Sequence, residues 1–184
     1  LSRYPEVLTM EEQALDEEEI WNCLKKAMEG AISQFVETRT LEGENLRRDI
    51  IDKLDGMAEM VEFIEVRSPK IIAEYREKLE EKVRELLADT QIDDSRIAAE
   101  VVIFADKICT DEEVVRLKSH ISHMKDVLLS DEAGIGRKLD FIAQEMNREA
   151  NTILSKANDL EVSNRGIDLK TEIEKVREQI QNIE

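Results

Sequence analysis

Residues 136–156 read GRKLDFIAQEMNREANTILSK, and this stretch decides the fold class. Its apolar residues recur every three or four positions, which places them on one side of an α-helix because such a helix turns about every 3.6 residues. These apolar positions are Leu139, Ile142, Met146, Ala150, Ile153 and, just beyond the stretch, Ala157. The stretch is therefore predicted to be an amphipathic helix that buries this side against other helices.

The same pattern appears before and after this stretch. The apolar residues before it are Val114, Leu117, Ile121, Met124 and Leu128, and those of the last segment are Leu169, Ile173, Val176, Ile180 and Ile183. The last set alternates spacings of four and three, a stripe narrow enough for a coiled-coil-like partner helix. That stripe either packs in the core of this chain or forms a contact between subunits.

The helical pattern also covers residues 17–66, and a few residues predict where helices end. We expect a break or bend at Gly43, since glycine costs about 1 kcal/mol in a helix relative to alanine. Pro69 is expected to end this region and to begin a new helix, because the residue before a proline avoids the α-helical conformation. Thr110, with Glu113 three residues later, predicts a capping box at the start of a further helix.

The composition agrees with an all-α protein. Of the 184 residues, 38% are charged, 41% are hydrophobic and only 4% are aromatic, with six glycines and two prolines. Few turn-forming and aromatic residues favour long helices over a β-sandwich or a β-barrel. We therefore predict long amphipathic helices that form an extended, oligomeric helical bundle.

Charge and cysteine content exclude several classes of protein. The formal net charge of −17 argues against a general phosphate-binding surface, although a local basic groove is compatible with it. No apolar run approaches the roughly 18 residues of a membrane span, so no membrane partner is expected. Cys23 and Cys109 lie far apart, without the spacing of metal ligands, which predicts two reduced thiols in a cytoplasmic protein.

Polar residues form a second stripe on the helix predicted at 136–156. Asparagine, serine and aspartate are weak helix formers, so a whole row of them predicts hydrogen bonds to something specific. The partner could be a neighbouring helix, a polynucleotide backbone or metal-bound water. The row consists of Asp140, Gln144, Asn147, Asn151, Ser155 and Asn158.

Charged residues near this row suit phosphate or metal binding. Arg137 and Arg148 offer planar donors for phosphate or carboxylate. Glu145 and Glu149, one helical turn apart, could share a divalent cation or could be ordinary solvated acids. In the preceding helix, His120 could transfer a proton, ligate a metal or be a hydrogen-bonded structural residue.

Several stretches together resemble the YicC family. They are GRKLDF at 136–141, QEMNREANT at 144–152, EIEKVREQIQNIE at 172–184, RTLEGENL at 39–46 and EEVVRLKSH at 112–120. The resemblance spans most of the chain and implies the C-terminal portion of a divalent-metal-dependent endoribonuclease, which cleaves phosphodiester bonds in small or structured RNA. It also implies a cytoplasmic hexamer. Members of the family carry an N-terminal half, and most of that half is expected to be absent from this chain.

The same resemblance divides the chain and assigns roles to residues, as hypotheses. Residues 1–40 would end the N-terminal region, partly as helix, and residues 41–184 would form the helical C-terminal domain. Catalytic roles fall to Glu112, His120, Glu145 and Glu149. RNA-binding roles fall to Arg116, Arg137, Arg148, Asn151 and Lys156. The metal, Mn²⁺ or Mg²⁺, would be held by Asp140, Glu145 and Glu149.

A second hypothesis assigns no chemistry to this chain. A non-catalytic helical oligomerisation or scaffold module would use the apolar stripe at 169–183 and the polar row as contacts between subunits. Catalysis would then belong to the part of the N-terminal half that lies outside this chain.

Overall fold

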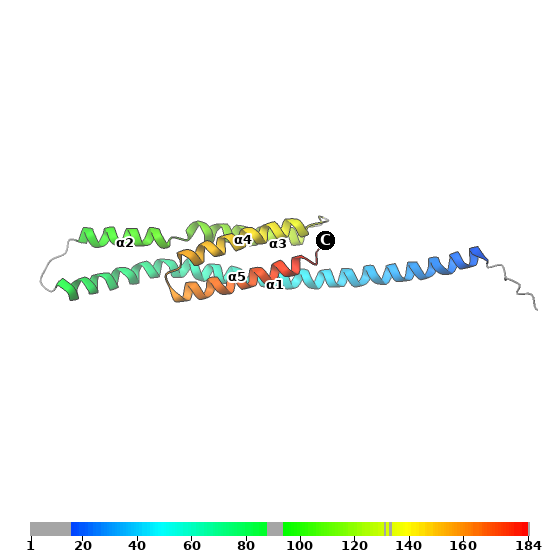
Figure 1. Cartoon of the computed structure of the whole chain (residues 1–184), viewed down its shortest axis with the longest axis horizontal. Helices are drawn as coiled ribbons and strands as arrows, with labels where there is room; N and C mark the ends of the chain where they lie inside the picture. The colour runs from blue at the N-terminus through cyan, green and yellow to red at the C-terminus, as the bar shows by residue number, and fades with distance from the viewer. Residues whose placement is uncertain (1–15, 88–93, 131, 133, 184) are drawn as a thin grey trace, which may run out of the picture. The chain divides into compact units, whose positions relative to one another are not determined.

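The structure is a computed structural model that describes residues 16–87, 94–130, 132 and 134–183. These residues form five helices and no β-strand (Figure 1). The helices are α1 (Glu17–Leu87), α2 (Asp94–Ile108), α3 (Asp111–Leu129), α4 (Gly136–Lys156) and α5 (Leu160–Ile180). The predicted all-α fold class is therefore confirmed. The chain divides into two compact units, residues 1–44 and residues 45–184.

In the first unit, the described residues form one helical segment, residues 17–44 of α1. Asp16 caps its start, since its Oδ1 atom accepts hydrogen bonds from the backbone N–H groups of Glu18 (3.0 Å) and Glu19 (3.3 Å). Large apolar side chains are exposed along this segment, and the exposed fraction of Trp21 is 60%. They are Ile20, Trp21, Leu24, Met28, Ile32, Phe35, Val36 and Leu41.

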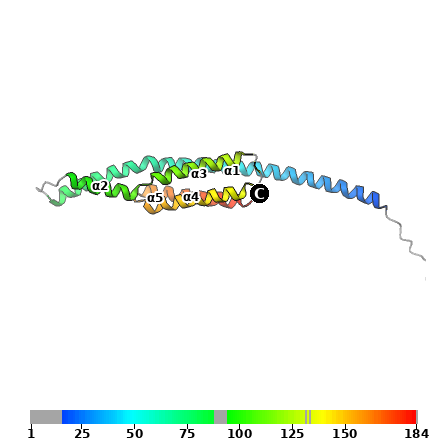
Figure 2. The ribbon, with the colours of Figure 1, turned by 90° about the horizontal axis from the view of Figure 1, so that it is seen from above.

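The second unit contains a four-helix bundle built from residues 45–68 of α1 and from α3, α4 and α5 (Figure 2). Each helix contributes one apolar stripe to a shared core, whose buried side chains are aliphatic or methionine and include no aromatic ring among the described residues. The α1 stripe is Ile50, Leu54, Met57, Val61 and Ile64, all fully buried. In α5, the buried residues of the predicted stripe are Leu169, Ile173, Val176 and Ile180. That stripe therefore serves the core of this chain.

Polar side chains join neighbouring helices around this core. In each pair of neighbours, residue numbers rise along one helix as they fall along the other, so adjacent helices are antiparallel, as in an up-down-up-down bundle. The joined residues are Asp55 with Lys125 and Glu65 with Lys118 (α1–α3), Arg116 with Glu149 and Glu113 with Lys156 (α3–α4), Asp140 with Arg177 and Asn147 with Glu174 (α4–α5), and Asp49 with Gln179 and Arg67 with Asp159 (α1–α5).

Beyond the four-helix bundle, α1 continues beside α2. The rings of Tyr75 on α1 and Phe104 on α2 are stacked, with centroids 3.7 Å apart and an interplanar angle of 11°. Figures 1 and 2 both show α2 alongside the last part of α1. Because α3 begins three residues after α2 ends, the α2–α3 joint lies next to α1 where the two-helix part meets the bundle.

The predicted breaks at Gly43 and Pro69 were wrong, because α1 continues through both residues. Pro69 carries no N–H group and therefore removes one hydrogen bond of the helix. Contacts on either side compensate: the Ser68 hydroxyl donates to the carbonyl of Ile64 (2.8 Å), and Arg67 pairs with Glu74 across the proline. Ile64, in the turn before the proline, is fully buried in the core, and Arg67 also donates to Asp159 at the start of α5, so tertiary packing here overrides the local signal.

The predicted capping box at the start of α3 was also wrong. Thr110 does precede the helix, but its side chain makes no capping hydrogen bond. The Oε1 atom of Glu113 instead accepts a hydrogen bond from Lys156 of α4 at 2.8 Å, and its Oε2 atom is buried with no hydrogen-bond partner in the described part of the chain. The Thr110 hydroxyl is left buried without a hydrogen-bond partner among the described residues.

Gly136 begins α4 in close contact with the backbone near the end of α5. A Cβ atom at this position would lie 2.3 Å from the carbonyl oxygen of Ile183, and a backbone atom cannot move aside as a flexible side chain can. Gly56, inside α1, is different, since a Cβ atom there would meet nothing within 4 Å.

We expect Gly136→Ala to lower the free energy of unfolding by about 1–3 kcal/mol, because it over-packs this contact. Gly56→Ala, the matched control, should raise that free energy by about 0.5–1 kcal/mol, since alanine is the better helix former. Urea unfolding measures both changes. Effects of the same sign and size would contradict the close approach at Gly136.

Arg67 connects the two sides of Pro69 with the start of α5. Its Nη2 atom donates to Glu74 (3.1 Å) and to Asp159, the N-cap of α5 (2.8 Å). Burial raises the pKa of Asp159, but hydrogen bonds from the Val162 N–H and Arg67 lower it, and the net pKa lies below its usual value. The hydrogen bond from Arg67 also lowers the pKa of Glu74.

Two carboxylates with lowered pKa values stabilise the fold above their unfolded-state pKa values, and this contribution is lost as the pH falls through the lower folded-state values. We therefore expect the free energy of unfolding to decrease as the pH drops below about 4. Arg67→Met should lower stability at neutral pH and reduce this pH dependence. Urea titrations at several pH values test this, and a stability difference between the two proteins that does not shrink in acid would contradict it.

Candidate functional site

The helices α3 and α4 pack side by side (Figure 1). Charged residues of both helices lie along the edge between them. On each helix they recur mostly three or four residues apart, so they share one side of that helix. We call this set the α3–α4 charged row. It consists of Glu112, Glu113, Arg116 and His120 on α3, and of Glu145, Glu149 and Lys156 on α4.

Arg116 lies at the centre of the row, between two carboxylates. Its Nη2 atom donates to Glu112 on the same helix, and its Nη1 atom donates to Glu149 on α4 at 3.4 Å. Glu149 is 5% exposed, whereas 54% of the Arg116 side chain is exposed. A guanidinium has five N–H donors, so donors remain for an anionic ligand at the open side. The structure thus joins three of the predicted site residues.

Lys156 and Glu113 form the second link between α3 and α4. The lysine donates to Glu113 at 2.8 Å, and Glu113 is only 7% exposed. This hydrogen bond raises the pKa of Lys156 above its usual value, in spite of partial burial. The predicted RNA-binding lysine is therefore bonded within the bundle. Sequence reasoning missed the role of Glu113, although its spacing of four residues from the core residue Leu117 was a signal.

His120 lies one turn beyond Arg116 on the same side of α3. The antiparallel register that pairs Arg116 with Glu149 places His120 level with Glu145 on α4. Both His120 and Glu145 are half-buried, and Glu145 is paired with Arg148 at 3.0 Å. All four predicted catalytic residues thus belong to one row.

The other predicted site residues lie on different sides of α4. Asp140 faces α5, where it accepts a hydrogen bond from Arg177 at 3.0 Å. Asn151 donates to Asn147 at 3.3 Å, and Asn147 in turn donates to Glu174 of α5, so this part of the polar row is a helix–helix interface. The predicted phosphate ligands Arg137 and Arg148 are exposed.

The predicted metal ligands are not brought together within one chain. Asp140 and Glu149 are nine residues apart, which places them on opposite sides of α4, about 180° around the helix axis. Asp140 is paired with Arg177 and Glu149 with Arg116. Over the described ranges, no group of three or more histidine, cysteine, aspartate or glutamate side chains could hold a metal ion.

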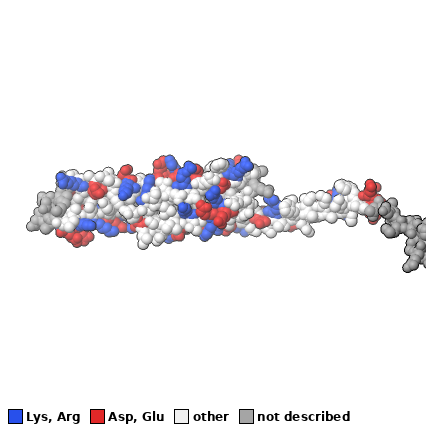
Figure 3. Space-filling view, viewed as in Figure 1, with Lys and Arg blue, Asp and Glu red and all other residues white. Residues whose placement is uncertain are grey.

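Figure 3 shows the charges on one face of the second unit. On this face, Lys and Arg are interspersed with Asp and Glu and form no continuous basic area. A polyanion that approaches this face would therefore find single basic side chains rather than a basic field. No helix in the described part of the chain has the length and apolar character that crossing a bilayer requires.

Comparison with known proteins bears on the whole chain. Residues 64–184 match the family described as "Endoribonuclease YicC-like, C-terminal", and residues 1–48 match "Endoribonuclease YicC-like, N-terminal region". The chain is 44% identical over 185 residues to the probable endoribonuclease YicC of Clostridioides difficile, covering 100% of this chain and 63% of that protein. Identity to the probable endoribonuclease YicC of Haemophilus influenzae is 35% over 182 residues, covering 99% and 62%. The chain therefore spans less than two thirds of these relatives.

Lys156→Met separates a structural from a ligand-binding role of this lysine. We expect the free energy of unfolding to fall by about 1–3 kcal/mol, because Glu113 would remain buried without its donor. Lys82→Met, at an exposed position of α1, should change it by less than about 0.5 kcal/mol. Adding Glu113→Gln to Lys156→Met should restore part of the loss. Unfolding curves that do not distinguish Lys156→Met from Lys82→Met would show that the pair is not structural.

Proposed function

Because the chain belongs to the YicC-like endoribonuclease family, as its sequence predicted, we propose that it forms the helical portion of an endoribonuclease that cleaves phosphodiester bonds in RNA. The observation that carries this proposal is the position of the α3–α4 charged row. The whole row lies inside the matched residues 64–184. Small or structured RNA is the proposed substrate.

The row contains the groups that such a reaction needs. Cleavage of a phosphodiester requires a base that activates the attacking oxygen and an acid that protonates the leaving oxygen. His120, beside Glu145, is the proposed proton-transfer group, and the carboxylates of Glu112 and Glu149 flank Arg116.

Phosphate recognition is assigned to the exposed arginines. The Arg116 side chain is 54% exposed and lies one helical turn before His120, and Arg137 and Arg148 are exposed on α4. Planar guanidinium groups bind phosphate oxygens in a fork geometry, which suits them to an RNA backbone. Asn151 lies beside this exposed side of α4 and is the proposed polar contact to the sugar–phosphate chain. Lys156 has its first role in holding Glu113.

We propose that a divalent metal, Mn²⁺ or Mg²⁺, binds only in the assembled protein. Asp140, Glu145 and Glu149 of one chain do not fit a single ion, since Asp140 and Glu149 lie on opposite sides of α4. Further ligands would have to come from a second copy of this chain. A cytoplasmic homo-oligomer, a hexamer by family resemblance, completes the proposal.

A non-catalytic assembly module is the second candidate function. It is favoured by the large apolar side chains exposed along residues 17–44, which include Trp21, Leu24 and Phe35. Exposed apolar side chains that gather on one segment commonly mark a surface for another protein chain.

An RNA-cleavage assay on the intact protein separates the two candidates. We expect Glu145→Gln with Glu149→Gln to slow internal cleavage of a labelled structured RNA by about a hundredfold or more, because acid–base groups of a row contribute on this scale. The assay is run with Mn²⁺, with Mg²⁺ and with a chelator, and sedimentation confirms that the variant assembles normally.

Glu77→Gln with Glu81→Gln is the matched control. These two glutamates are exposed, are also four residues apart, and lie on α1 away from the row. Equal activity of the two double variants would refute the proposed catalytic role of the row. Loss of assembly together with loss of cleavage would favour the second candidate function.

A further inference from the structure

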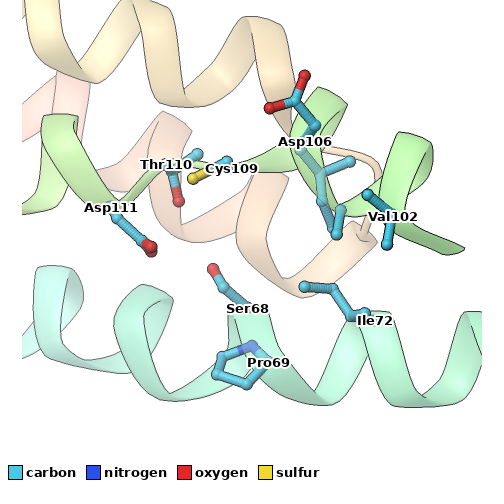
Figure 4. A pocket seen from close by; sticks show the side chains of 10 residues that line it. Ser68, Pro69, Ile72, Val102, Asp106, Cys109, Thr110 and Asp111 are labelled. Carbon is cyan, nitrogen blue, oxygen red and sulfur yellow. The ribbon is translucent and has the colours of Figure 1, made fainter.

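A pocket of about 440 Å³ lies between α1 and the α2–α3 joint, outside the α3–α4 charged row. Its volume is in the range of pockets that hold small organic ligands. Figure 4 shows side chains from both sides of the joint and from α1 around one space. The lining residues are Ser68, Pro69, Ile72, Val102, Ala105, Asp106, Ile108, Cys109, Thr110 and Asp111.

The polar side of the pocket offers hydrogen-bond acceptors. Thr110 is 4% exposed, and its Oγ1 atom has no hydrogen-bond partner among the described residues. Ser68 already donates its hydroxyl hydrogen to the carbonyl of Ile64 at 2.8 Å, so toward the pocket its oxygen can only accept. Figure 4 shows the oxygens of Ser68, Thr110 and Asp111 pointing toward the same space.

A buried hydroxyl without a partner is unfavourable and calls for an occupant that supplies the missing bond. Because Ser68 and the Asp111 carboxylate can only accept here, that occupant must bring donors. The lining set also contains apolar side chains, among them Ile72, Val102 and Ile108. The occupant therefore combines a donor group with an apolar body.

The acidic side chains that line the pocket favour a cationic ligand. Asp106 and Asp111 line the pocket, and the lining set contains no lysine or arginine. Lys156 is outside the lining set and donates to Glu113 at 2.8 Å. Figure 4 shows the Asp111 carboxylate pointing into this space and the Asp106 carboxylate pointing away from it. A phosphate or carboxylate ligand would thus face Asp111 and no basic side chain of the lining set, whereas an ammonium or amidinium group would be attracted.

We propose that this pocket is a binding site for a small organic cation, an amine or amidine carried on an apolar body. Its charged group donates hydrogen bonds to Thr110, Ser68 and Asp111, and its body packs against Ile72 and Val102. This site is separate from the proposed RNA-cleaving row and does not depend on it.

Benzamidine is a suitable probe, and the two cysteines provide the measurement. Cys109 lines the pocket and Cys23 lies in the first unit, and both thiols are free and exposed. We expect benzamidine at about ten times its Kd to slow alkylation of Cys109 by iodoacetamide about elevenfold, by mass action, and to leave Cys23 unaffected. The folded protein is alkylated and then digested, and mass spectrometry of the two cysteine-containing peptides gives both alkylation rates.

Two neutral or anionic analogues test the role of charge. Benzamide has the same ring and nearly the same shape without the cation, and benzoate carries the opposite charge. Neither should protect Cys109 at the same concentration. Protection by benzamide or benzoate equal to that by benzamidine would overturn the assignment of a cation site.

Three variants test the position of the ligand. Thr110→Val should raise the Kd for benzamidine about tenfold, because the hydroxyl loses its bond while the shape is kept. Ala105→Phe should fill the pocket and abolish protection, whereas Ala98→Phe, at an exposed position of the same helix, should leave it unchanged. Protection that survives Ala105→Phe would overturn the proposal. A change in oligomer mass on Ala105→Phe would assign the pocket to a partner chain and would also overturn it.

Discussion

The burial of one apolar stripe from each of four helices holds the second unit together. A fully buried aliphatic side chain contributes about 1.5–3 kcal/mol, whereas an exposed ion pair contributes about 0–1 kcal/mol. The five fully buried residues of α1, from Ile50 to Ile64, therefore outweigh the surface pairs such as Lys118 with Glu65. The polar pairs between neighbouring helices all agree with one antiparallel register. In this register, Arg116 meets Glu149 at the α3–α4 edge.

Most of the fold could be predicted because apolar spacing is a strong signal. The stripes of α3, α4 and α5 were read correctly, and α4 covers the predicted start at Gly136. The failures concern residues whose behaviour depends on a distant partner. Pro69 is a helix end by local preference, yet Arg67 and the buried turn before it keep α1 continuous. Glu113 does not form the capping box with Thr110 but bonds to Lys156, which lies 43 positions away in the sequence.

The candidate site shows the same division between local and distant information. The i, i+4 spacing of Glu145 and Glu149 was visible in the sequence, and the nine-residue spacing that separates Asp140 from Glu149 was equally visible. What sequence could not supply was the register between helices, which decides that His120 is level with Glu145 and that Asp140 meets Arg177 of α5. The catalytic and RNA-binding roles of these residues stay predictions, and the division of the chain at residues 40 and 41 does too.

The buried core cluster of the described residues contains no aromatic ring, and this limits what tryptophan fluorescence can measure in this protein. The chain has a single tryptophan, Trp21, which is exposed and lies in the first unit, outside the four-helix bundle. Intrinsic tryptophan fluorescence therefore reports the surroundings of residues 17–44 and does not directly report unfolding of the bundle core. Far-ultraviolet circular dichroism, which follows the helical backbone itself, sees the bundle directly. The same tryptophan is a specific probe for binding of another chain to the first unit, because its emission shifts when the surroundings of that segment change.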